Sequence, residues 1–579
     1  MSAIDKIEHV VVLILENHSF DQMLGSLSAV YDGKEGRDRL EGIDPGRPGS
    51  NDDVGGPPIA QEQTVERQMT LDPHHEVQHV ATQLQNNNGG FVRDFVEAFP
   101  DTPPSHDERR YVMGYYPLDF LPGLHQLARN FTVCDHWFSS LPGPTWPNRF
   151  FALSGTCLGH VDMPNDGTHK GDLAGYFQQT QDTIFDRLNE KQISWKVYFH
   201  DLPQSWTMKQ LRAPHNAAQY YYIRRFYEDA RGHPDDFPQF SLIEPDYFGY
   251  LQNDDHPPHD VMRAQKLIAD VYNALRRNEA LWRSTLLVVF YDEHGGFYDH
   301  VVPPAVIPPD DHVATIPYKD GPRPFKFDQL GLRVPAILAS PWVKAGVERT
   351  QFDHTSLLRF VTDKWNLREL DSTRVKDANS IAVALTEIAE RTDTLRGITL
   401  RPDQLKPIDL DLEDNATDKE TEHQVALKQL AQFLPSALWE KTKETGFETA
   451  PKVGSILARC SEYTKEQSAA FFNWLRGFCE RRLAGLYETG RHEVVLSSPD
   501  KVDQKYTSER NRVVRFLATQ KSRAMQGLTE RVENSKGRRS PAEQQHAAKM
   551  LAAILGRSVY ADQLNHAKRW LRRIAPRNP

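Results

Sequence analysis

Two short polar stretches stand out because each one directly follows an apolar run, 9–15 or 285–291. Both runs have the length and the β-branched content of a buried strand in a parallel sheet. In open α/β sheets ligands bind beyond the carboxyl ends of the strands, so the two polar stretches are expected to meet there. Their carboxylate and amide oxygens are hard ligands that suit a divalent cation. The predicted metal ligands are Glu16, Asn17, Asp292 and Glu293.

Each stretch also has a purely structural interpretation. Asn17 and Ser19 are good helix N-caps, and taken alone the first stretch fits a cap better than a metal site. The adjacent acids of the second stretch would repel each other in a buried place unless a cation lay between them, whereas a surface pair would need no ligand. The apolar run before them and the tight Gly295-Gly296 turn after them favour the buried arrangement.

A threonine is the candidate nucleophile. Thr145 follows a rigid Gly-Pro turn, and Pro147 fits the first turn of a helix. A hydroxyl at a helix N-terminus faces backbone N–H groups and the positive end of the helix dipole, which together favour a phosphate group. Because threonine is a poor nucleophile until a metal or a base activates it, the acidic stretches are needed nearby. Without them Thr145 would be interpreted as a simple N-cap. Asn148 in the same segment is a candidate substrate contact.

Histidines are the candidate acids and hydrogen-bond donors. Phosphoryl transfer needs donors to the non-bridging oxygens and an acid for the leaving alcohol, and imidazole can supply both. Among 23 histidines any single one is more often structural than catalytic. His256 and one of His74 or His75 are the preferred candidates. The full set of candidates is His74, His75, His200, His256 and His354.

The spacing of apolar residues predicts the elements that carry these groups. Short apolar runs are typical of buried parallel strands, and the longer stretch 259–281 has helical spacing. Strands that alternate with helices favour an α/β fold, with a mostly parallel sheet covered by helices on both faces. The predicted strands are 9–15, 195–199, 240–243, 285–291 and 334–339.

Two segments rich in Gly, Pro and Asp, 30–70 and 302–330, are predicted to be surface loops or lids. After about residue 400 the strand patterns end and helical patterns dominate. We therefore divide the chain into a catalytic domain, 1–400, and a helical C-terminal domain, 401–579. The predicted C-terminal helices are 420–434, 464–489, 505–534, 541–556 and 560–574.

Composition narrows the class of protein. A net charge of -10 describes an acidic protein and argues against an overall nucleic-acid binder. Four cysteines without a CxxC pair make a zinc ribbon or a disulfide scaffold improbable. No apolar run is long enough for a membrane span. The run 9–15 lacks the basic start and cleavage site of a signal peptide, so we expect a cytoplasmic protein or export by a route that leaves this end uncut.

The end of the chain differs in charge from the rest. The segment 501–579 is strongly basic, while the remainder is more acidic than the average of the chain. Cationic amphipathic helices are attracted to anionic membrane surfaces, so peripheral membrane contact through these helices is one interpretation, and docking on nucleic acid is another. A solvated helical face explains the same charges and is preferred.

Four long motifs resemble those of the bacterial phospholipase C and acid phosphatase family, which is also similar to the plant non-specific phospholipases C. They follow one another in the family's order within the first 370 or so residues. Several long motifs in order are far more specific than any one of them. The motifs are Ile7 to Gly25, Phe131 to Thr156, Ser241 to Pro258 and Leu286 to Pro304.

This resemblance implies an alkaline-phosphatase-like α/β sandwich and a role for each candidate residue. The metal ligands would be the four residues of the two polar stretches, and Thr145 the nucleophile. His75 and His256 would contact the phosphoryl group, and His200 would do so less securely. Relatives with acid phosphatase activity tend to carry serine at the nucleophile position and phospholipases C threonine, so Thr145 favours a phospholipase C.

The predicted function is hydrolysis of the glycerol-side phosphodiester of phospholipids through a phosphothreonine intermediate. One divalent metal ion is expected, and calcium, magnesium, manganese or zinc would each suit four oxygen ligands. A phosphomonoesterase with the same site and a smaller phosphoester substrate is the nearest alternative. A catalytically inactive protein that binds metal or lipid is the second alternative. No nucleic-acid partner is expected, and the sequence does not indicate the oligomeric state.

Overall fold

The computed structural model describes residues 2–69, 71–164, 180–248, 252–404 and 421–432, together with residues 177, 434 and 438. Contacts between Cα atoms divide the chain into one unit, Met1–Thr442, and a second, Lys443–Pro579. All described residues belong to the first unit. The predicted helices at 464–489, 505–534, 541–556 and 560–574 lie outside them, as does the basic segment 501–579.

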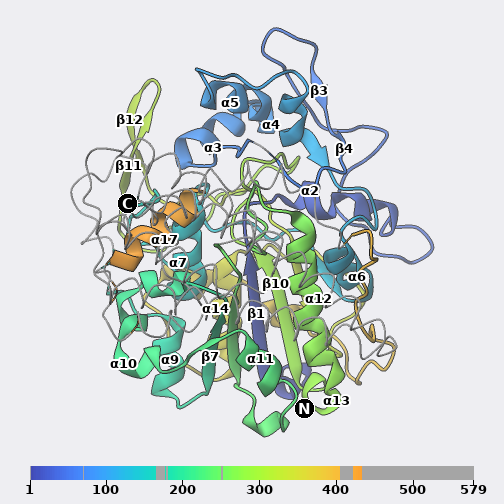
Figure 1. Cartoon of the computed structure of the whole chain (residues 1–579), viewed down its shortest axis with the longest axis vertical. Coiled ribbons are helices and arrows are strands. Elements are labelled where there is room, and N and C mark those ends of the chain that lie inside the picture. Colours follow the sequence, from blue (N-terminus) through green and yellow to red (C-terminus); the bar gives the residue numbers. More distant parts are fainter. Residues whose placement is uncertain are drawn as a thin grey trace, which may run out of the picture. The chain divides into compact units, whose positions relative to one another are not determined.

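An eight-stranded sheet forms the centre of the described unit (Figure 1). Strand β1 lies near its middle and pairs in parallel with β10 on one side and with β9 on the other. Every residue of β1 and β10 is buried, which is typical of strands covered on both faces. The strands, in sheet order, are β14 (Gly346–Glu348), β6 (Thr132–Cys134), β13 (Ala336–Ala339), β10 (Thr285–Tyr291), β1 (His9–Leu15), β9 (Phe240–Glu244), β7 (Trp195–Phe199) and β8 (Tyr220–Tyr222).

The sheet confirms the predicted α/β class and its mostly parallel character, with one correction. The strand predicted at 334–339 is β13, and it runs antiparallel to both neighbours, β10 and β6. A parallel return needs a crossover, usually a helix, that carries the chain to the opposite edge. The described segment 292–335 contains no helix. The chain therefore re-enters the sheet from the edge at which β10 ends, and Ala336 pairs with Phe290.

The longer helices pack around this sheet. The stretch 259–281 forms α12 (Val261–Arg277), which begins at an Asp260 N-cap and is followed after Asn278 by α13 (Glu279–Trp282). Helix α12 packs beside α6 (Pro122–Asn130), and α14 (His354–Lys364) packs beside α7 (Thr145–Ser154). The other α-helices of the described chain up to residue 404 are α1 (Ala3–Lys6), α2 (Phe20–Leu24), α3 (Val77–Gln83), α4 (Gln85–Asn88), α5 (Phe91–Ala98), α9 (Ile184–Glu190), α10 (Pro214–Ala217), α11 (Arg224–Asp229) and α15 (Thr373–Asp377).

The two segments predicted as loops differ in structure. The segment 30–70 is mostly irregular and carries only two-residue strands, β2 (Ser50–Asn51), β3 (Ile59–Ala60) and β4 (Glu62–Gln63), the last paired with β5 (Gly114–Tyr115). The segment 302–330 instead contains a hairpin of β11 (Ala314–Tyr318) and β12 (Gly321–Phe325), so its prediction as a loop was wrong in part. Prolines are tolerated in this hairpin because each strand of a two-stranded ribbon has a free edge, where no backbone N–H donor is needed.

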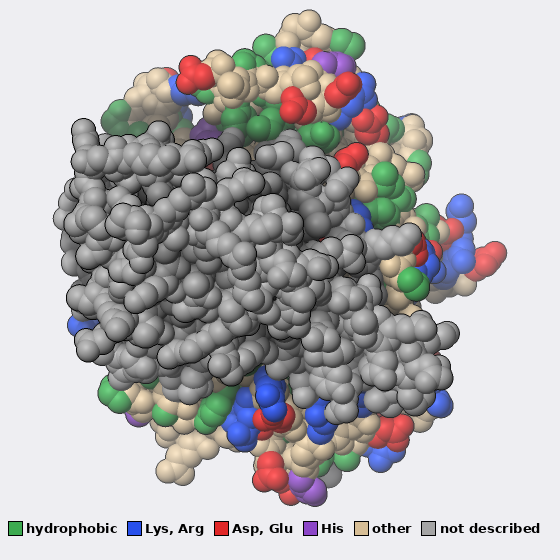
Figure 2. Space-filling model, in the orientation of Figure 1, with side chains coloured by type: hydrophobic (Ala, Val, Ile, Leu, Met, Phe, Trp, Pro, Cys, Tyr) green, Lys and Arg blue, Asp and Glu red, His purple; other side chains and the backbone are tan. Residues whose placement is uncertain are grey.

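Helix α17 (Glu422–Gln432) confirms the helix predicted at 420–434. It belongs to the same compact unit as the sheet. No helix in the described part of the chain has both the length and the apolar composition needed to cross a bilayer. On the face drawn in Figure 2, acidic and basic side chains of the described residues stand in small interspersed groups.

Candidate active site

The two predicted metal-binding stretches lie side by side at the carboxyl ends of β1 and β10. The parallel register pairs Leu15 with Tyr291, so the residues that follow leave the sheet together. The Asp292 N–H donates to the Leu15 carbonyl oxygen at 3.1 Å. Glu16 and Glu293 are fully buried. The sheet therefore brings the two stretches to one place, as the strand-end argument predicts.

A tight turn lets the two stretches approach each other. Asn17 has a left-handed backbone (φ 60), a conformation that non-glycine residues seldom adopt outside constrained sites. Gly295 also has a positive φ of 61, and a Cβ atom there would lie 2.3 Å from the Asn17 carbonyl oxygen. Only glycine fits at this position, which explains the Gly-Gly pair that follows the acids.

Thr145 is the first residue of α7, as predicted. A rigid turn holds it there, because the Asn148 side chain accepts from the Leu141 N–H at 3.1 Å and donates to the Gly143 carbonyl at 2.9 Å. Asn148 is fully buried, so it shapes the turn from inside. The Thr145 hydroxyl donates to Glu293 Oε1 at 3.0 Å. The threonine predicted as the nucleophile thus contacts a predicted metal ligand.

An arginine that the sequence analysis did not single out joins the site. Arg149 Nε donates to Asp292 Oδ2 at 2.8 Å, and its Nη2 donates to Glu16 Oε1 at 3.0 Å. Its side chain is only 2% exposed. Arg149 follows Thr145 by four residues on α7, the spacing that places two side chains on one face of a helix. That spacing is the signal in the sequence that could have identified it.

Several oxygens of the acidic stretches have no hydrogen-bond partner among the residues that the structure describes. They are Glu16 Oε2, Asn17 Oδ1 and Glu293 Oε2, and all three are buried. The Asn17 amide is oriented by a contact of 3.3 Å between its Nδ2 and His75 Nε2, which leaves Oδ1 free. A buried oxygen without a donor is costly, and hard oxygens of this kind on two adjoining stretches suit a divalent cation.

The charges of the site also favour a bound cation. Three buried carboxylates face one buried guanidinium, that of Arg149. Burial and the charge of Asp292 raise the pKa of Glu293 well above its ordinary value. Burial opposes ionisation of Glu16 too, but His423 and Arg149 outweigh it and lower the pKa of that carboxyl to about 2. A divalent cation would supply the positive charge that Glu293 lacks.

Asp292 differs from the other three predicted ligands. Its Oδ1 accepts from the backbone N–H of Asn17 at 3.3 Å and of Glu293 at 2.9 Å, and its Oδ2 accepts from Arg149. Both oxygens therefore already have donors from the protein. Asp292 can still offer a remaining lone pair, but its first effect is to lock the two stretches together.

Two of the predicted catalytic histidines lie at the site. His75 Nε2 is 3.6 Å from Glu293 Oε1, and the ring centroids of His75 and His256 are 6.4 Å apart. Both side chains are buried. Burial lowers the pKa of His75 and lowers that of His256 to about 3. The structure thus selects His75 over His74 as the histidine of that tandem that faces the acidic stretches.

The other predicted histidines have contacts elsewhere. His200 follows β7, two strands from β1, and its Nδ1 lies 2.8 Å from the Glu244 carbonyl oxygen. His354 is fully buried; its Nδ1 accepts from Trp137 Nε1 at 3.2 Å, and its Nε2 lies 2.6 Å from the Asp292 carbonyl oxygen. With both ring nitrogens engaged, His354 supports the backbone of Asp292. His74 lies outside this group and pairs with Glu76 at 3.4 Å.

Helix α17 contributes one more histidine, which the sequence analysis did not predict. His423 Nδ1 lies 2.9 Å from Glu16 Oε1, and the ring is 1% exposed. It stacks on Tyr247 with ring centroids 4.5 Å apart, and Gln424 donates to the Tyr247 carbonyl at 2.6 Å. The local sequence around His423 carries no motif, so only the fold reveals the contact.

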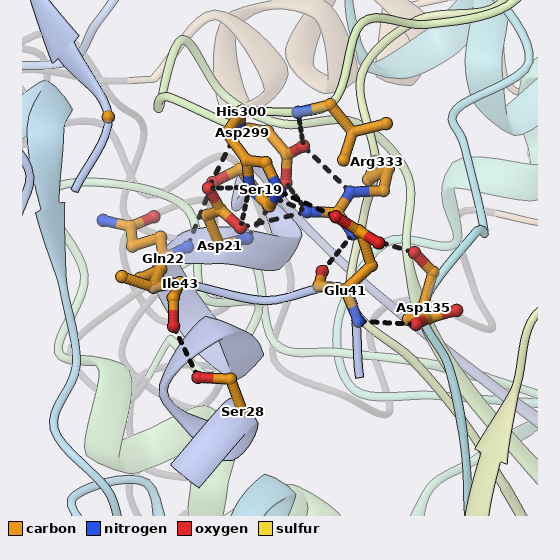
Figure 3. Close-up of polar contacts among 12 residues, drawn as sticks. Ser19, Asp21, Gln22, Ser28, Glu41, Ile43, Asp135, Asp299, His300 and Arg333 are labelled. Carbon is orange, nitrogen blue, oxygen red and sulfur yellow. Dashed lines mark hydrogen bonds and ion pairs between the residues drawn. The ribbon is translucent and has the colours of Figure 1, made fainter. Parts of the chain in front are cut away.

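A network behind the site fixes the two loops that carry the acidic stretches (Figure 3). Arg333 is fully buried and bonds Asp21 Oδ1 at 3.0 Å and Asp299 Oδ1 at 2.9 Å. His300 Nδ1 lies 2.8 Å from Asp21 Oδ2. Ser19, the predicted N-cap of α2, donates its hydroxyl to the Tyr298 carbonyl at 2.7 Å. Each loop is therefore held against the other at several points.

Comparison with known proteins shows which family the chain belongs to. The Phosphoesterase family model matches residues 7–368. Non-specific phospholipase C3 of Arabidopsis thaliana is 31% identical over 468 residues, 75% of this chain and 83% of the relative. Phospholipase C B of Mycobacterium tuberculosis is 30% identical over 419 residues, 64% of this chain and 76% of the relative. A solved protein of the alkaline phosphatase superfamily from Vibrio parahaemolyticus is 11% identical, covers 55% of this chain and 82% of that chain, and has a TM-score of 0.27.

The protein is a phosphoric ester hydrolase. It belongs to the phosphoesterase family, and the resemblance predicted from the four motifs is confirmed. The matched range 7–368 contains Thr145, Arg149 and the four predicted metal ligands. His423 lies beyond that range, so it is a feature of this site that the family match does not include.

Proposed function

We propose that the protein is a metal-dependent phospholipase C that hydrolyses the glycerol-side phosphodiester of phospholipids. The relatives named phospholipase C support the substrate class, because each match covers most of the relative's length. One observation carries the chemistry: Thr145 donates to Oε1 of Glu293, while the other oxygen of that carboxylate is buried without a hydrogen-bond partner in the described chain. A hydroxyl beside such a carboxylate is placed for attack on phosphorus.

The proposed metal ligands come from the two acidic stretches. Glu16, Asn17 and Glu293 would hold the metal, with Asp292 locking their positions. A bound divalent cation lowers the pKa of a neighbouring hydroxyl and neutralises charge that develops on phosphate. Its identity is left open by this donor set, since oxygen ligands suit several divalent ions.

Thr145 Oγ1 attacks phosphorus in line with the diacylglycerol oxygen. The Thr145 hydroxyl gives its proton to Glu293 Oε1, to which it already donates. The new bond joins Oγ1 to phosphorus, and the bond from phosphorus to the glycerol oxygen breaks. Burial keeps His75 and His256 neutral in the free site, so the one that acts as acid takes up a proton beside the anionic phosphate. It passes this proton to the glycerol oxygen, and diacylglycerol leaves. Water then attacks the phosphothreonine, which releases the phosphorylated headgroup and restores the hydroxyl. The helix N-terminus at Thr145 favours the negative phosphoryl group throughout.

The test compares Thr145→Val with Thr362→Val. Thr362 is a matched control, since it is a buried threonine of α14 whose hydroxyl has no partner in the described chain. We expect Thr145→Val to lose about three or more orders of magnitude in kcat, the usual effect of removing a nucleophile, and the control to keep its activity. Near wild-type turnover by Thr145→Val would reject the mechanism.

The substrate assignment is tested with the wild-type enzyme. Release of diacylglycerol from phosphatidylcholine vesicles is measured beside hydrolysis of a chromogenic phosphomonoester. A phospholipase C gives diacylglycerol and little monoester hydrolysis. The reverse preference would make the enzyme a phosphomonoesterase with the same site, and turnover of neither together with metal binding would indicate an inactive binding protein.

A further inference from the structure

A second group of possible metal ligands stands at the start of α3, outside the set assigned to the active site. It consists of His74, Glu76 and His79, and one ligand atom from each lies within 4.8 Å of the other two. His74 Nδ1 is 3.4 Å from Glu76 Oε2, and His79 Nε2 is 3.9 Å from the same oxygen. One nitrogen of each ring thus lies near the same carboxylate oxygen, and the two ring centroids are 4.7 Å apart.

That oxygen has no hydrogen-bond partner in the described chain. Glu76 Oε2 is buried, and the side chain of Glu76 is only 10% exposed. The side chains of His74 and His79 are 35% and 20% exposed, so the group is open to solvent on one side only. A buried carboxylate oxygen near two imidazoles and without a hydrogen-bond partner is suited to bind a metal ion.

The far side of His79 is arranged as in known metal sites. Its Nδ1 lies 2.9 Å from Asp94 Oδ1, and the other Asp94 oxygen accepts from Gln83 Nε2 at 2.9 Å. Gln83 Nε2 also donates to the His74 carbonyl at 2.8 Å. A carboxylate that accepts from one ring nitrogen fixes the tautomer and leaves the other nitrogen, Nε2, free to bind a metal.

The distances suit a small tetrahedral ion. With metal–ligand bonds of about 2.0–2.1 Å, neighbouring ligand atoms of a tetrahedral zinc site lie about 3.3 Å apart. The two nitrogen–oxygen separations, 3.4 and 3.9 Å, are close to this value. Two imidazoles and one carboxylate are a usual zinc ligand set, and they leave a fourth position for water.

A second cluster of the same kind differs because an arginine neutralises its carboxylates. Asp21, Asp299 and His300 are also close enough to hold a metal. There, however, the buried guanidinium of Arg333 bonds both carboxylates (Figure 3). The group at α3 has no arginine or lysine among its recorded contacts with described residues.

We propose that His74 Nδ1, Glu76 Oε2 and His79 Nε2 form a second divalent cation site, of the zinc type, beside the active site. His75 lies between two of these ligands in the sequence, and its own ring faces Asn17 and Glu293. An ion held by the residues on either side of His75 ties the segment down and so positions that ring. His74 and His79 are positioning residues in this arrangement, because they act on the reaction through His75.

The experiment counts bound ions in the full chain. Metal-free protein is titrated with Zn²⁺ by calorimetry, and the bound ion is counted by elemental analysis after dialysis. Co²⁺ serves as a second probe, because a tetrahedral site gives it strong visible absorption. We expect two ions per wild-type chain and one in His79→Ala, with loss of the tetrahedral Co²⁺ bands.

Matched variants separate the two sites. His136→Ala is the control, since His136 is also a partly buried histidine (26% exposed) that pairs with an aspartate at 2.8 Å. It should keep both ions. Glu293→Gln should lose the active-site ion and keep the Co²⁺ bands. Asp94→Asn leaves all three ligands in place and should weaken zinc binding about 10- to 100-fold, the usual effect of losing such a partner.

Two outcomes overturn the proposal. One is a folded His79→Ala, checked by circular dichroism, that binds as many ions as the wild type. The other is a wild type that binds a single ion which Glu293→Gln loses. The ion count does not depend on turnover, so failure here is distinguishable from failure of the proposed phospholipase activity.

Discussion

His423 Nδ1 lies 2.9 Å from Glu16 Oε1, so α17 reaches the end of the central strand β1. The ring fills the space between the carboxylate and Tyr247, on which it stacks. Residues beyond the family match therefore complete one wall of the active site.

His423→Ala should lower kcat/KM by about 10- to 100-fold, because Glu16 loses a charged or hydrogen-bonding neighbour and the wall opens to water. The measurement is diacylglycerol release at several substrate concentrations. His125→Ala is the control, because His125 is equally buried and bonds only the Met23 carbonyl among its recorded partners, at 2.8 Å. Equal losses in the two variants would show a stability effect and contradict a role at the site.

Arg149→Met should cost about two or more orders of magnitude in activity. The substitution keeps the length of the side chain but leaves the carboxylates of Glu16 and Asp292 without their shared cation, and such uncompensated buried charge is costly. Arg149→Lys should not restore activity, because one ammonium cannot reproduce the forked contacts. Kinetics and thermal melting are compared with Arg187→Met, another buried arginine that pairs with Asp182 and Glu190. An active Arg149→Met enzyme would refute the bridging role.

Removal of metal should abolish activity and lower the melting temperature. An ion that binds only the folded state stabilises it by about 2.7 kcal/mol at a concentration 100 times its Kd. After treatment with a chelator, activity should return on titration with one divalent ion, and the choice of ion is an outcome of the assay. Glu293→Gln should not regain activity at any metal concentration. Full activity in exhaustively chelated wild type would exclude metal dependence.

Much of the fold could be predicted from the sequence because β1 and β10 are unbroken apolar runs with polar residues directly after them. The direction of β13 was predicted wrongly. It depends on whether a helix crosses over between two strands, and the loop predicted at 302–330 was not used to decide this. The hairpin β11–β12 was hidden by prolines, which usually argue against strands.

Some residues of the site could be predicted from the sequence and others could not. Glu16, Asn17, Asp292 and Glu293 were predictable because strand ends of one sheet converge. Arg149 was missed, although its spacing of four residues from Thr145 was a usable signal. An arginine in a helix is normally exposed, and only the meeting of two strand ends gives it buried partners. His423 depends on a contact between residues far apart in the chain, and no local pattern encodes such a contact.

The network in Figure 3 predicts a pH dependence of stability. Burial opposes protonation of His300, but its bond to Asp21 and the charge of that carboxylate outweigh burial and raise the pKa to about 9 from 6.5. Because the pKa of His300 is raised in the folded state, its protonated ring stabilises the fold fully below pH 6.5. This stabilisation is lost as the pH rises through about 9. The loss should be on the order of 1 kcal/mol, since the ring is partly exposed. Urea unfolding followed by fluorescence gives the free energy of unfolding at each pH. This free energy should fall with rising pH in wild type and fall less in His300→Gln. Identical pH profiles would show that His300 does not carry the proton.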